Sequence, residues 1–474
     1  MDGNNLNSQS FGYKQELNRV LTFKDLVFYG LVFMAPISCM IFFGLLSIVS
    51  EGHAVLAYVI AFIAVVFTAF SFGEMAKAFP LAGSTYSYTQ RAIDPRAGFV
   101  GGWLILLDYF SLPMIVNLTS ASYMHEFFPQ VPVWIWGVIF IAICTLINYR
   151  GIEVTSKADN FMMIIMIALI VVFLTLAIRF VAIGNAELSA TYIYNPPTFA
   201  LPAVMGAAAI AIVNFLGFDG ITTLSEEAKD GGKKIAAAIL VACGVQATVF
   251  IVITYFATAV NPDWTTIPGP EIGFYDIAYK LGGNFLQIFA PSVFIVSGIG
   301  TCLATQAAAS RVLYGMGRDK VILKNFSYVH PKYKSPYFGV LVMAALFIFG
   351  TIFLQYEFLA DIIAFGGLSG FVCVNLSVFV HYFIKKREGS FNVVKHVIFP
   401  ILGMAVSVAL IASMGIPAKV VGFTWMAIAI VYVVVRYNVS PEFRANLEKV
   451  RFSEKKEDMA VEAEVTENVE PNEE

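Results

Sequence analysis

Asp219 lies between Gly217 and Gly220, inside an apolar stretch that runs from about residue 199 to residue 226. Hydrocarbon disfavours a charged side chain, and glycine weakens a helix, so a plain membrane-spanning helix favours neither residue type. A carboxylate at this depth can bind an ammonium group or carry a proton. It can also cap the half-helix that Gly220 would begin. The residues alone leave these three roles open.

A second acid, Asp108, lies roughly eleven residues into an apolar segment that begins near residue 97. At about 1.5 Å per residue, a helix places it about 16 Å deep, close to the middle of a bilayer. Asp108 and Asp219 together would give two negative points, as a diamine with two ammonium groups requires. A packing hydrogen bond to a neighbouring helix explains Asp108 equally well. Asn117, further along the segment, would serve the same wall or only a helix contact.

Pro36 interrupts the first apolar segment, because proline removes a helical hydrogen bond and clashes with the preceding turn. Ser38 could cap a new half-helix, whose first N–H groups carry partial positive charge. Before Gly217, another half-helix would end with free carbonyl groups that suit an ammonium. The predicted substrate-binding residues are Ala35, Pro36, Ile37, Ser38, Asp108, Tyr109, Asn214, Phe215, Leu216, Gly217, Phe218 and Asp219.

Glu226 and Glu227 follow in the same stretch, close to the three lysines between residues 229 and 234. They would either pair with charges at the membrane edge or form a gate at the mouth of a pathway. Asp219, Glu226 and Glu227 are therefore the candidates for gating or proton coupling.

Membrane-spanning helices must position these residues. Hydrophobic residues make up 58% of the 474 and charged residues only 13%, which is typical of a membrane protein. A helix needs about 20 apolar residues to span the hydrocarbon layer. Twelve segments qualify, at residues 24–49, 54–79, 97–126, 132–149, 158–184, 199–226, 235–260, 284–314, 337–354, 357–384, 396–413 and 418–437.

The interrupted segments are the first and the sixth, and two broken helices at corresponding positions are typical of transporters built from inverted repeats. We predict an all-α integral membrane protein with five-helix repeats at 23–184 and 185–390, and two appended helices at 391–439. When both termini are placed in the cytoplasm, 27 of the 30 Lys and Arg residues fall on that side, as basic residues prefer. Residues 1–22 would be a cytoplasmic tail, and residues 440–474 an acidic, disordered one.

The sequence contains no pattern that predicts catalysis or a cofactor. The five cysteines lie in different apolar segments, and the five histidines lie at segment ends or in loops, without metal-ligand spacing. The sequence also lacks a phosphate-binding glycine loop, an HExxH motif and a nucleophile elbow. We expect no enzyme, metal, cofactor or nucleic-acid partner. The expected partners are a small amine or amino acid and the lipid bilayer. A proton is a candidate for the coupling ion, which the sequence leaves open.

Three motifs resemble those of the amino acid/polyamine/organocation (APC) superfamily of transporters. FLGFDGITTLSEE (Phe215 to Glu227) resembles its sixth-helix signature, and ASRVLYGMGRDKVIL (Ala309 to Leu323) resembles its motif at the inner end of helix 8. FPLAGSTYSYTQRAIDPRAGFVGGW is similar to its segment between helices 2 and 3. Bacterial putrescine importers of this superfamily share versions of LLDY, FLGFD and TTLSEE with the chain.

The resemblance implies the five-plus-five fold and transport of amino acids or polyamines, commonly by proton coupling or exchange. Amino acid carriers of the family usually bind the substrate carboxylate with a Gly-Ser-Gly-like turn in helix 1. Pro36 has no N–H to donate there, which favours a substrate without a carboxylate. Some polyamine carriers place tryptophans in helices 6 and 8. This chain has none there, so Phe215, Phe218 and Tyr109 would face a cation.

The leading hypothesis is a secondary active transporter in the plasma membrane that imports a small cationic amine, putrescine or a related polyamine, by alternating access. One alternative is an amino acid permease of the same superfamily, acting as a symporter or exchanger. Another is a sensor of the same fold, which the shortness of both tails disfavours because neither is long enough to fold a signalling domain.

Overall fold

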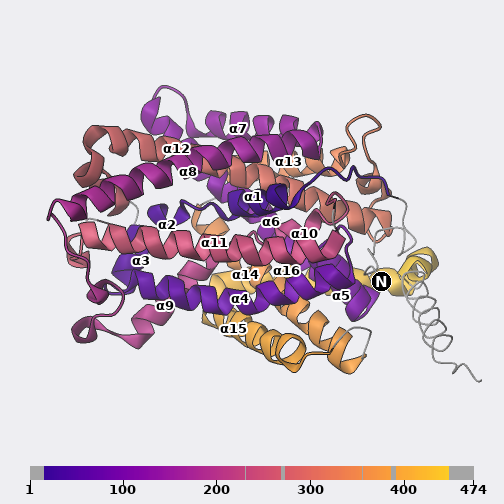
Figure 1. Ribbon diagram of the computed structural model, residues 1–474. Coiled ribbons are helices and arrows are strands. Elements are labelled where there is room, and N and C mark those ends of the chain that lie inside the picture. The colour runs from indigo at the N-terminus through magenta and orange to yellow at the C-terminus, as the bar shows by residue number, and fades with distance from the viewer. Residues whose placement is uncertain are drawn as a thin grey trace, which may run out of the picture.

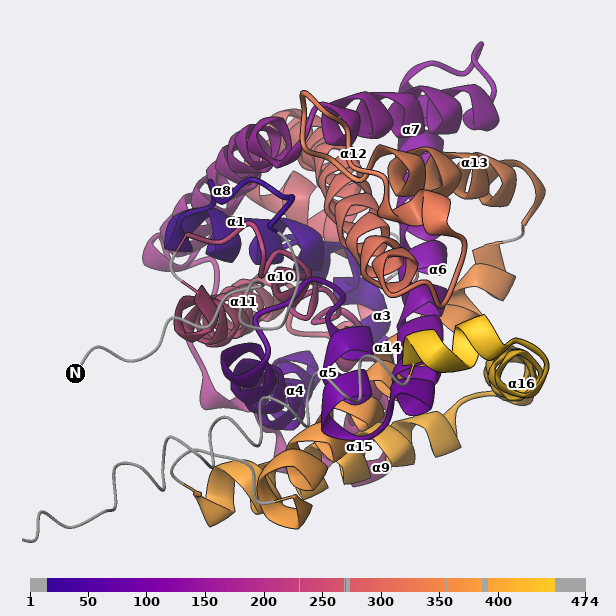
Figure 2. The same ribbon diagram turned by 90° about the vertical axis from the view of Figure 1, so that its right-hand side faces the viewer.

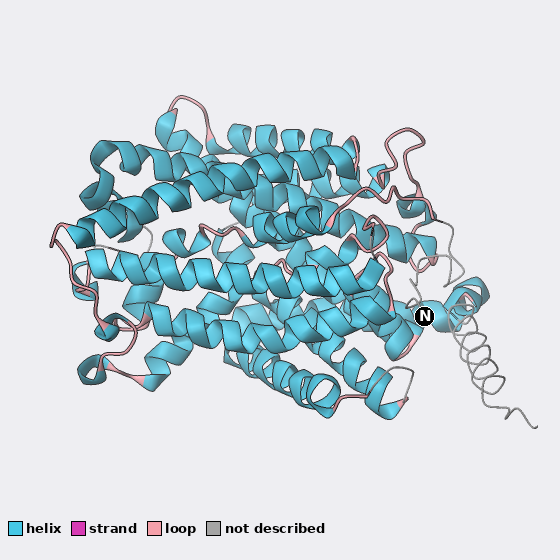
Figure 3. Cartoon of the chain, in the orientation of Figure 1, coloured by secondary structure: helices cyan, strands magenta, loops and turns pink. Residues whose placement is uncertain are grey.

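A computed structural model describes residues 15–229, 231–267, 269, 273–354, 356–385 and 391–447. In these ranges the regular structure is helical, apart from one isolated bridge between Leu21 and Ala228. Most of the helices lie roughly parallel or antiparallel to one another (Figure 3). The predicted tails at 1–22 and 440–474 lie mostly outside the described residues.

The first half of the chain begins with a helix in three pieces. These are α1 (Phe23–Met34), α2 (Ser38–Ile41) and α3 (Phe43–Val49). They are followed by α4 (Ala54–Ala78), α5 (Thr85–Ala92), α6 (Pro95–Phe127), α7 (Val133–Tyr149) and α8 (Ile152–Ala182). Local signals set the helix starts: Thr22 and Asp25 form a capping box for α1, and Asp94 caps α6 before Pro95.

The second half repeats the pattern of a broken helix followed by longer ones. After 3₁₀ turns at Ala190–Tyr192 and Pro196–Thr198 come α9 (Leu201–Val213), α10 (Gly220–Thr223), α11 (Gly231–Val260) and α12 (Gly273–Arg318). The 3₁₀ turns Trp264–Thr266 and Lys324–Ser327 flank α12. The chain continues with α13 (Tyr337–Phe353), α14 (Tyr356–Val378), π-helical turns at Phe379–Ile384 and Val394–Ile398, α15 (Phe399–Ser413) and α16 (Ile416–Val439).

The helices confirm the predicted fold class. Within the described ranges, nine helices are long and apolar enough to cross a membrane. Three shorter apolar helices, α7, α9 and α13, match the predicted fourth, sixth and ninth segments. α12 is interrupted at Gly283 (φ 57°), which is where the predicted eighth segment begins. The division into repeats at residues 184 and 390 stays a prediction.

The interior of the bundle positions the site. Figure 2 looks along many of the helices and shows α10 and α14 in the middle, with α7, α8, α15 and α16 at the periphery. The most apolar stretches of the first segment and of α12 are 72% buried, against 22% for α15 and α16, so the last two helices present most of their surface outward. The first described residues (indigo) and the last (yellow) lie toward the same end of the molecule, here called the terminal face (Figure 1).

Candidate functional site

The first helix is broken between Met34 and Ser38, at the predicted position. Ala35 has φ 53° and ψ 91°, in a region that residues other than glycine rarely adopt. The Met34 carbonyl accepts a hydrogen bond from Gln246 Nε2 of α11 at 3.1 Å. A side chain from a neighbouring helix therefore satisfies backbone that the break exposes, as membrane depth requires.

Ser38 does not cap the half-helix that follows Pro36, so this prediction is wrong. Ile37 occupies the capping position, and Ser38 is already the first helical residue, without a capping hydrogen bond. The Ser38 hydroxyl is buried and has no hydrogen-bond partner among the described residues. It lies in the wall of a cavity.

The sixth predicted segment is broken over residues 214–219, between α9 and α10. Gly217 has φ +120°, and a Cβ atom there would come within 2.6 Å of Phe33 Cδ2, so the close packing of the two breaks requires glycine. Within the described chain, the carbonyls of Asn214, Phe215 and Leu216 accept no hydrogen bond. This is the set of free carbonyl groups expected at the end of a half-helix.

Asp219 joins the second break to α6. Its Oδ2 accepts a hydrogen bond from the Tyr109 hydroxyl at 2.6 Å, and its Oδ1 accepts one from the Gly217 N–H at 3.2 Å. The side chain is fully buried and makes no capping hydrogen bond to α10. The capping role considered from the sequence is therefore wrong, because the carboxylate points back to the break.

Asp108, one residue before Tyr109, is also fully buried in α6. Neither of its carboxyl oxygens has a hydrogen-bond partner in the described part of the chain, so the packing hydrogen bond considered as the alternative explanation is not formed. The side chain faces the glycines of α14, where a Cβ atom on Gly367 would lie 3.5 Å from Asp108 Oδ2. Asn117 instead donates to the Gly137 carbonyl and to Thr351, which makes it a helix-packing residue.

A cavity of about 450 Å³ lies against both breaks. It extends to Ser413, at the end of the eleventh apolar segment, so it reaches away from the terminal face. Its polar side chains are Ser38, Asn214, Thr301 and Ser413, and the remaining lining is apolar. Asp108 and Asp219 do not line the cavity but lie behind its wall.

The aromatic residues at the cavity are Phe33 and Phe42. Phe215 packs against Phe250, with ring centroids 5.2 Å apart, and Phe218 packs against Phe371 at the same distance. Neither Phe215 nor Phe218 lines the cavity, although both were expected to face a cation. Tyr109 faces Asp219 instead.

Glu226 and Glu227 are fully buried and pair with arginines of α12 rather than with the lysines that follow them. Glu227 forms a two-pronged ion pair with Arg311, in which Nη2 lies 2.9 Å from Oε1. Glu226 Oε1 accepts hydrogen bonds from Arg318 Nη1 at 2.7 Å and from the Ala82 N–H at 3.0 Å. Paired charges therefore join α12 to the segment after α10.

The start of the chain lies over these ion pairs. The N–H groups of Val20 and Leu21 each donate to the Glu227 carbonyl at 3.0 Å. Gln15 Nε2 donates to the Glu226 carbonyl at 2.9 Å. The cavity is thus separated from the terminal face by two buried ion pairs and by the chain segment above them.

Asp159 of α8 is a deeply buried acid that the sequence reasoning did not single out. Its side chain is 1% exposed, and both carboxyl oxygens lack a hydrogen-bond partner within the described ranges. The signal was present, because Asp159 is the second residue of the predicted fifth segment.

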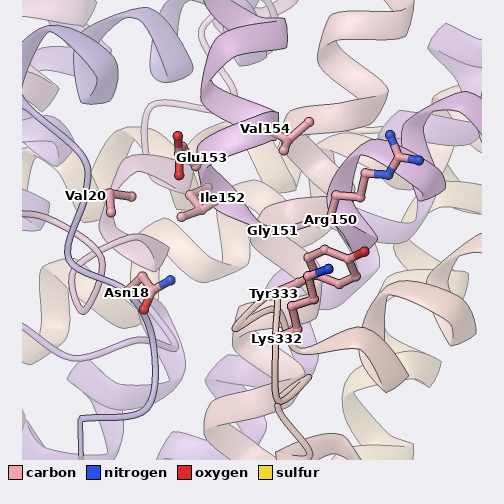
Figure 4. A pocket seen from close by; sticks show the side chains of 9 residues that line it. All are labelled: Asn18, Val20, Arg150, Gly151, Ile152, Glu153, Val154, Lys332 and Tyr333. Carbon is pink, nitrogen blue, oxygen red and sulfur yellow. The ribbon is translucent and has the colours of Figure 1, made fainter.

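A smaller cavity of about 360 Å³ contains none of the predicted site residues. Figure 4 shows that three separate parts of the chain line it: the start near Asn18, the turn at Arg150 to Val154, and the loop with Lys332 and Tyr333. Apart from the buried Gly151 and Ile152, its lining is exposed or half-buried, and none of it belongs to the two breaks.

A bundle of apolar helices, two of them broken beside a central cavity, is the architecture of a multi-pass membrane transport protein. Residues 33–439 match the amino acid permease family. The chain belongs to this family, as the resemblance in its motifs predicted.

Several curated proteins are similar over most of the chain. The low-affinity putrescine importer PlaP of Escherichia coli (strain K12) is 31% identical over 423 residues, which cover 88% of this chain and 93% of that protein. The branched-chain amino acid permease BcaP of Bacillus subtilis (strain 168) is 24% identical over 449 residues, with the same two coverages. Cationic amino acid transporter 4 of Mus musculus is 24% identical over 395 residues, which cover 79% of this chain and 61% of that protein.

Proposed function

We propose that this protein is a secondary active transporter that imports a small cationic amine, putrescine or a related polyamine, by alternating access. The observation that carries the proposal is the pair of buried carboxyl groups, Asp108 and Asp219, behind a cavity that lies against two helix breaks. Buried acids at membrane depth are costly, so a functional role is their default explanation, and binding of a cationic substrate is the role proposed here. The 31% identity to a putrescine importer supports the same substrate class.

The breaks offer an ammonium group several acceptors. One end of the amine would bind the free carbonyls of residues 214–216 and the Asp219 carboxylate, and Phe33 would add an aromatic face. The other end would reach Asp108. Leu216 lines the cavity and lies close to Asp108, since a Cβ atom on Gly367 would meet both Leu216 Cδ2, at 2.8 Å, and Asp108 Oδ2. Leu216 would therefore move when a diamine binds.

In the proposed orientation the terminal face is cytoplasmic, in agreement with the 27 basic residues counted on that side. The cavity then extends toward the outside, and the ion pairs of Glu226 and Glu227 close the inner side. Import would require those ion pairs to part while the outer side closes.

An amino acid permease is the second candidate, because the lining of the cavity is mostly apolar and suits an aliphatic side chain. The 24% identity to a branched-chain amino acid permease favours it as well. A sensor of the same fold would bind either ligand without moving it.

Uptake by the purified protein in proteoliposomes tests the proposal. We expect saturable uptake of radiolabelled putrescine that unlabelled spermidine reduces and leucine does not. Asp219→Asn should abolish it, whereas the same change at the exposed Asp276 should not alter it. Saturable leucine uptake without competition by putrescine would show that the substrate is an amino acid rather than an amine. Binding of putrescine without uptake would indicate the sensor.

A further inference from the structure

The carboxyl group of Asp159 has no role in the proposed amine site. It belongs to α8, and it lines neither cavity. An ionised carboxylate that is buried without hydrogen bonds or a paired cation is strongly disfavoured, and such a group takes up a proton instead. Asp159 has neither kind of partner in the described structure, and this favours the protonated form of its carboxyl group in this arrangement.

Three titratable groups from packed helices interact electrostatically with Asp159: Tyr29 of α1, Cys144 of α7 and Arg311 of α12. α11 also packs on α8 but adds no charged group to this set among the described residues. The Tyr29 hydroxyl already donates to the Ala304 carbonyl at 2.7 Å. Arg311 is therefore the cation within electrostatic reach of Asp159.

Arg311 is committed to other partners. Its guanidinium forms the ion pair with Glu227 and donates from Nη1 to the Ala307 carbonyl at 2.8 Å. Glu227 belongs to the segment after α10, whereas Arg311 and Asp159 belong to the long helices α12 and α8. If the inner side opens by moving that segment away from α12, Arg311 loses its carboxylate while Asp159 stays within its reach.

We propose that Asp159 binds the coupling proton of the transport cycle and that Arg311 exchanges Glu227 for Asp159 when the terminal face opens. The O–H bond of the Asp159 carboxyl breaks, and its proton passes to water that enters from the terminal face. The electron pair stays on the carboxylate, which then pairs with Arg311. One ion pair exists before and after the step, and one proton is released. This inference rests on the proposed transport function, because it requires an opening toward the terminal face.

The geometry favours Asp159 over Asp219 as the proton site. The Tyr109 hydroxyl and the Gly217 N–H already donate to the Asp219 carboxyl oxygens, so a proton there would compete with an existing hydrogen bond. Asp159 accepts no hydrogen bond in the described chain and, unlike Asp108, it has a cation, Arg311, within electrostatic reach. Asp219 is thus suited to a cationic substrate, and Asp159 to a proton.

The test measures opening directly and needs no substrate. Ser225, buried beside Glu226, is replaced by cysteine, and its labelling by a maleimide is followed by peptide mass spectrometry in the purified full-length protein over a range of pH. The same reporter is placed in the Asp159→Asn and Asp159→Glu variants. Because maleimide reactivity itself changes with pH, each rate is divided by that of Asp159→Asn at the same pH.

Release of one proton on opening allows at most about a tenfold rise in the open population per pH unit. We expect the normalised labelling of the Asp159 protein to rise severalfold with pH, and Asp159→Glu to retain part of this rise. A flat ratio in preparations that elute as a single species would overturn the inference. A rising ratio without putrescine uptake would keep the proton site and refute the amine substrate. Putrescine uptake with a flat ratio would keep the amine substrate and refute the proton site at Asp159.

Discussion

Glu227→Gln is the most direct perturbation of the closed terminal face. Both partners of the Glu227–Arg311 ion pair are buried, with side-chain exposures of 0% and 4%, so solvent screens it little. Removing one partner of a buried ion pair costs about 3–5 kcal/mol, because the other charge stays buried and unpaired. Glutamine keeps one acceptor oxygen for Arg311, which places the expected cost at about 3 kcal/mol.

This cost falls on the closed arrangement more than on an open one, where water can solvate Arg311 or Asp159 can pair with it. A difference of about 3 kcal/mol raises the open population by about a hundredfold, at about 1.4 kcal/mol for each factor of ten. The Ser225→Cys reporter measures the change as a faster labelling rate. Thermal unfolding of the purified protein should also begin at a lower temperature.

Glu153→Gln is the matched control. Glu153 pairs with Lys157 in α8, but both side chains are exposed, at 68% and 74%. The same chemical change there should leave labelling and unfolding unaltered, because exposed pairs contribute little. Equal labelling rates for Glu227→Gln and the unmodified protein would refute the reasoning, since the ion pair would then not hold the inner side closed.

Three further outcomes follow from the site. Asp219→Asn should abolish putrescine uptake while the amount of protein in the membrane stays unchanged on an immunoblot, and full uptake would exclude substrate binding by this carboxylate. Asp108→Asn should raise the KM for putrescine but not that for butylamine, because only the diamine has a second ammonium group. An equal rise for both would show that Asp108 acts on the site as a whole. Gly217→Ala should lower the unfolding temperature, because its Cβ would meet Phe33 Cδ2 at 2.6 Å and φ is +120°. Gly244→Ala in α11 is the control, because a Cβ atom there would have no neighbour within 4 Å. It should raise the unfolding temperature by an amount equivalent to about 1 kcal/mol. A similar loss of stability in both variants would contradict the steric explanation of Gly217.

The fold could be predicted from the sequence because the bilayer imposes strong rules on it. A membrane-spanning helix needs a minimum apolar length, and non-helical backbone at membrane depth must be buried in protein or line a water-filled cavity. Pro36 and Gly217 therefore located both helix breaks correctly. The fourth and ninth segments were also found, although their helices are short.

The details of the site were less predictable, because hydrogen bonds and ion pairs depend on contacts between distant parts of the chain. Ser38 and Asp219 have typical capping chemistry, but neither side chain caps a helix. Tyr109 determines the direction of the Asp219 carboxylate from 110 positions away in the sequence. Glu227 has lysines close by in sequence, yet its partner is Arg311, 84 positions further on.

The placement of the three unusual acids argues for a division of roles within the membrane. Asp219 is hydrogen-bonded at the break, and Asp108 is unpaired behind the cavity wall. Asp159 is unpaired as well, but its nearby cation is engaged by another carboxylate. In the proposed function, a cation that enters the cavity would reach the first two after Leu216 moves, without disturbing the two ion pairs near the terminal face. The proposed charge of Asp159 would depend on whether those pairs are intact. Substrate binding and closure of the terminal face would therefore depend on different carboxyl groups, and Arg311 would be the side chain through which opening changes the protonation of Asp159.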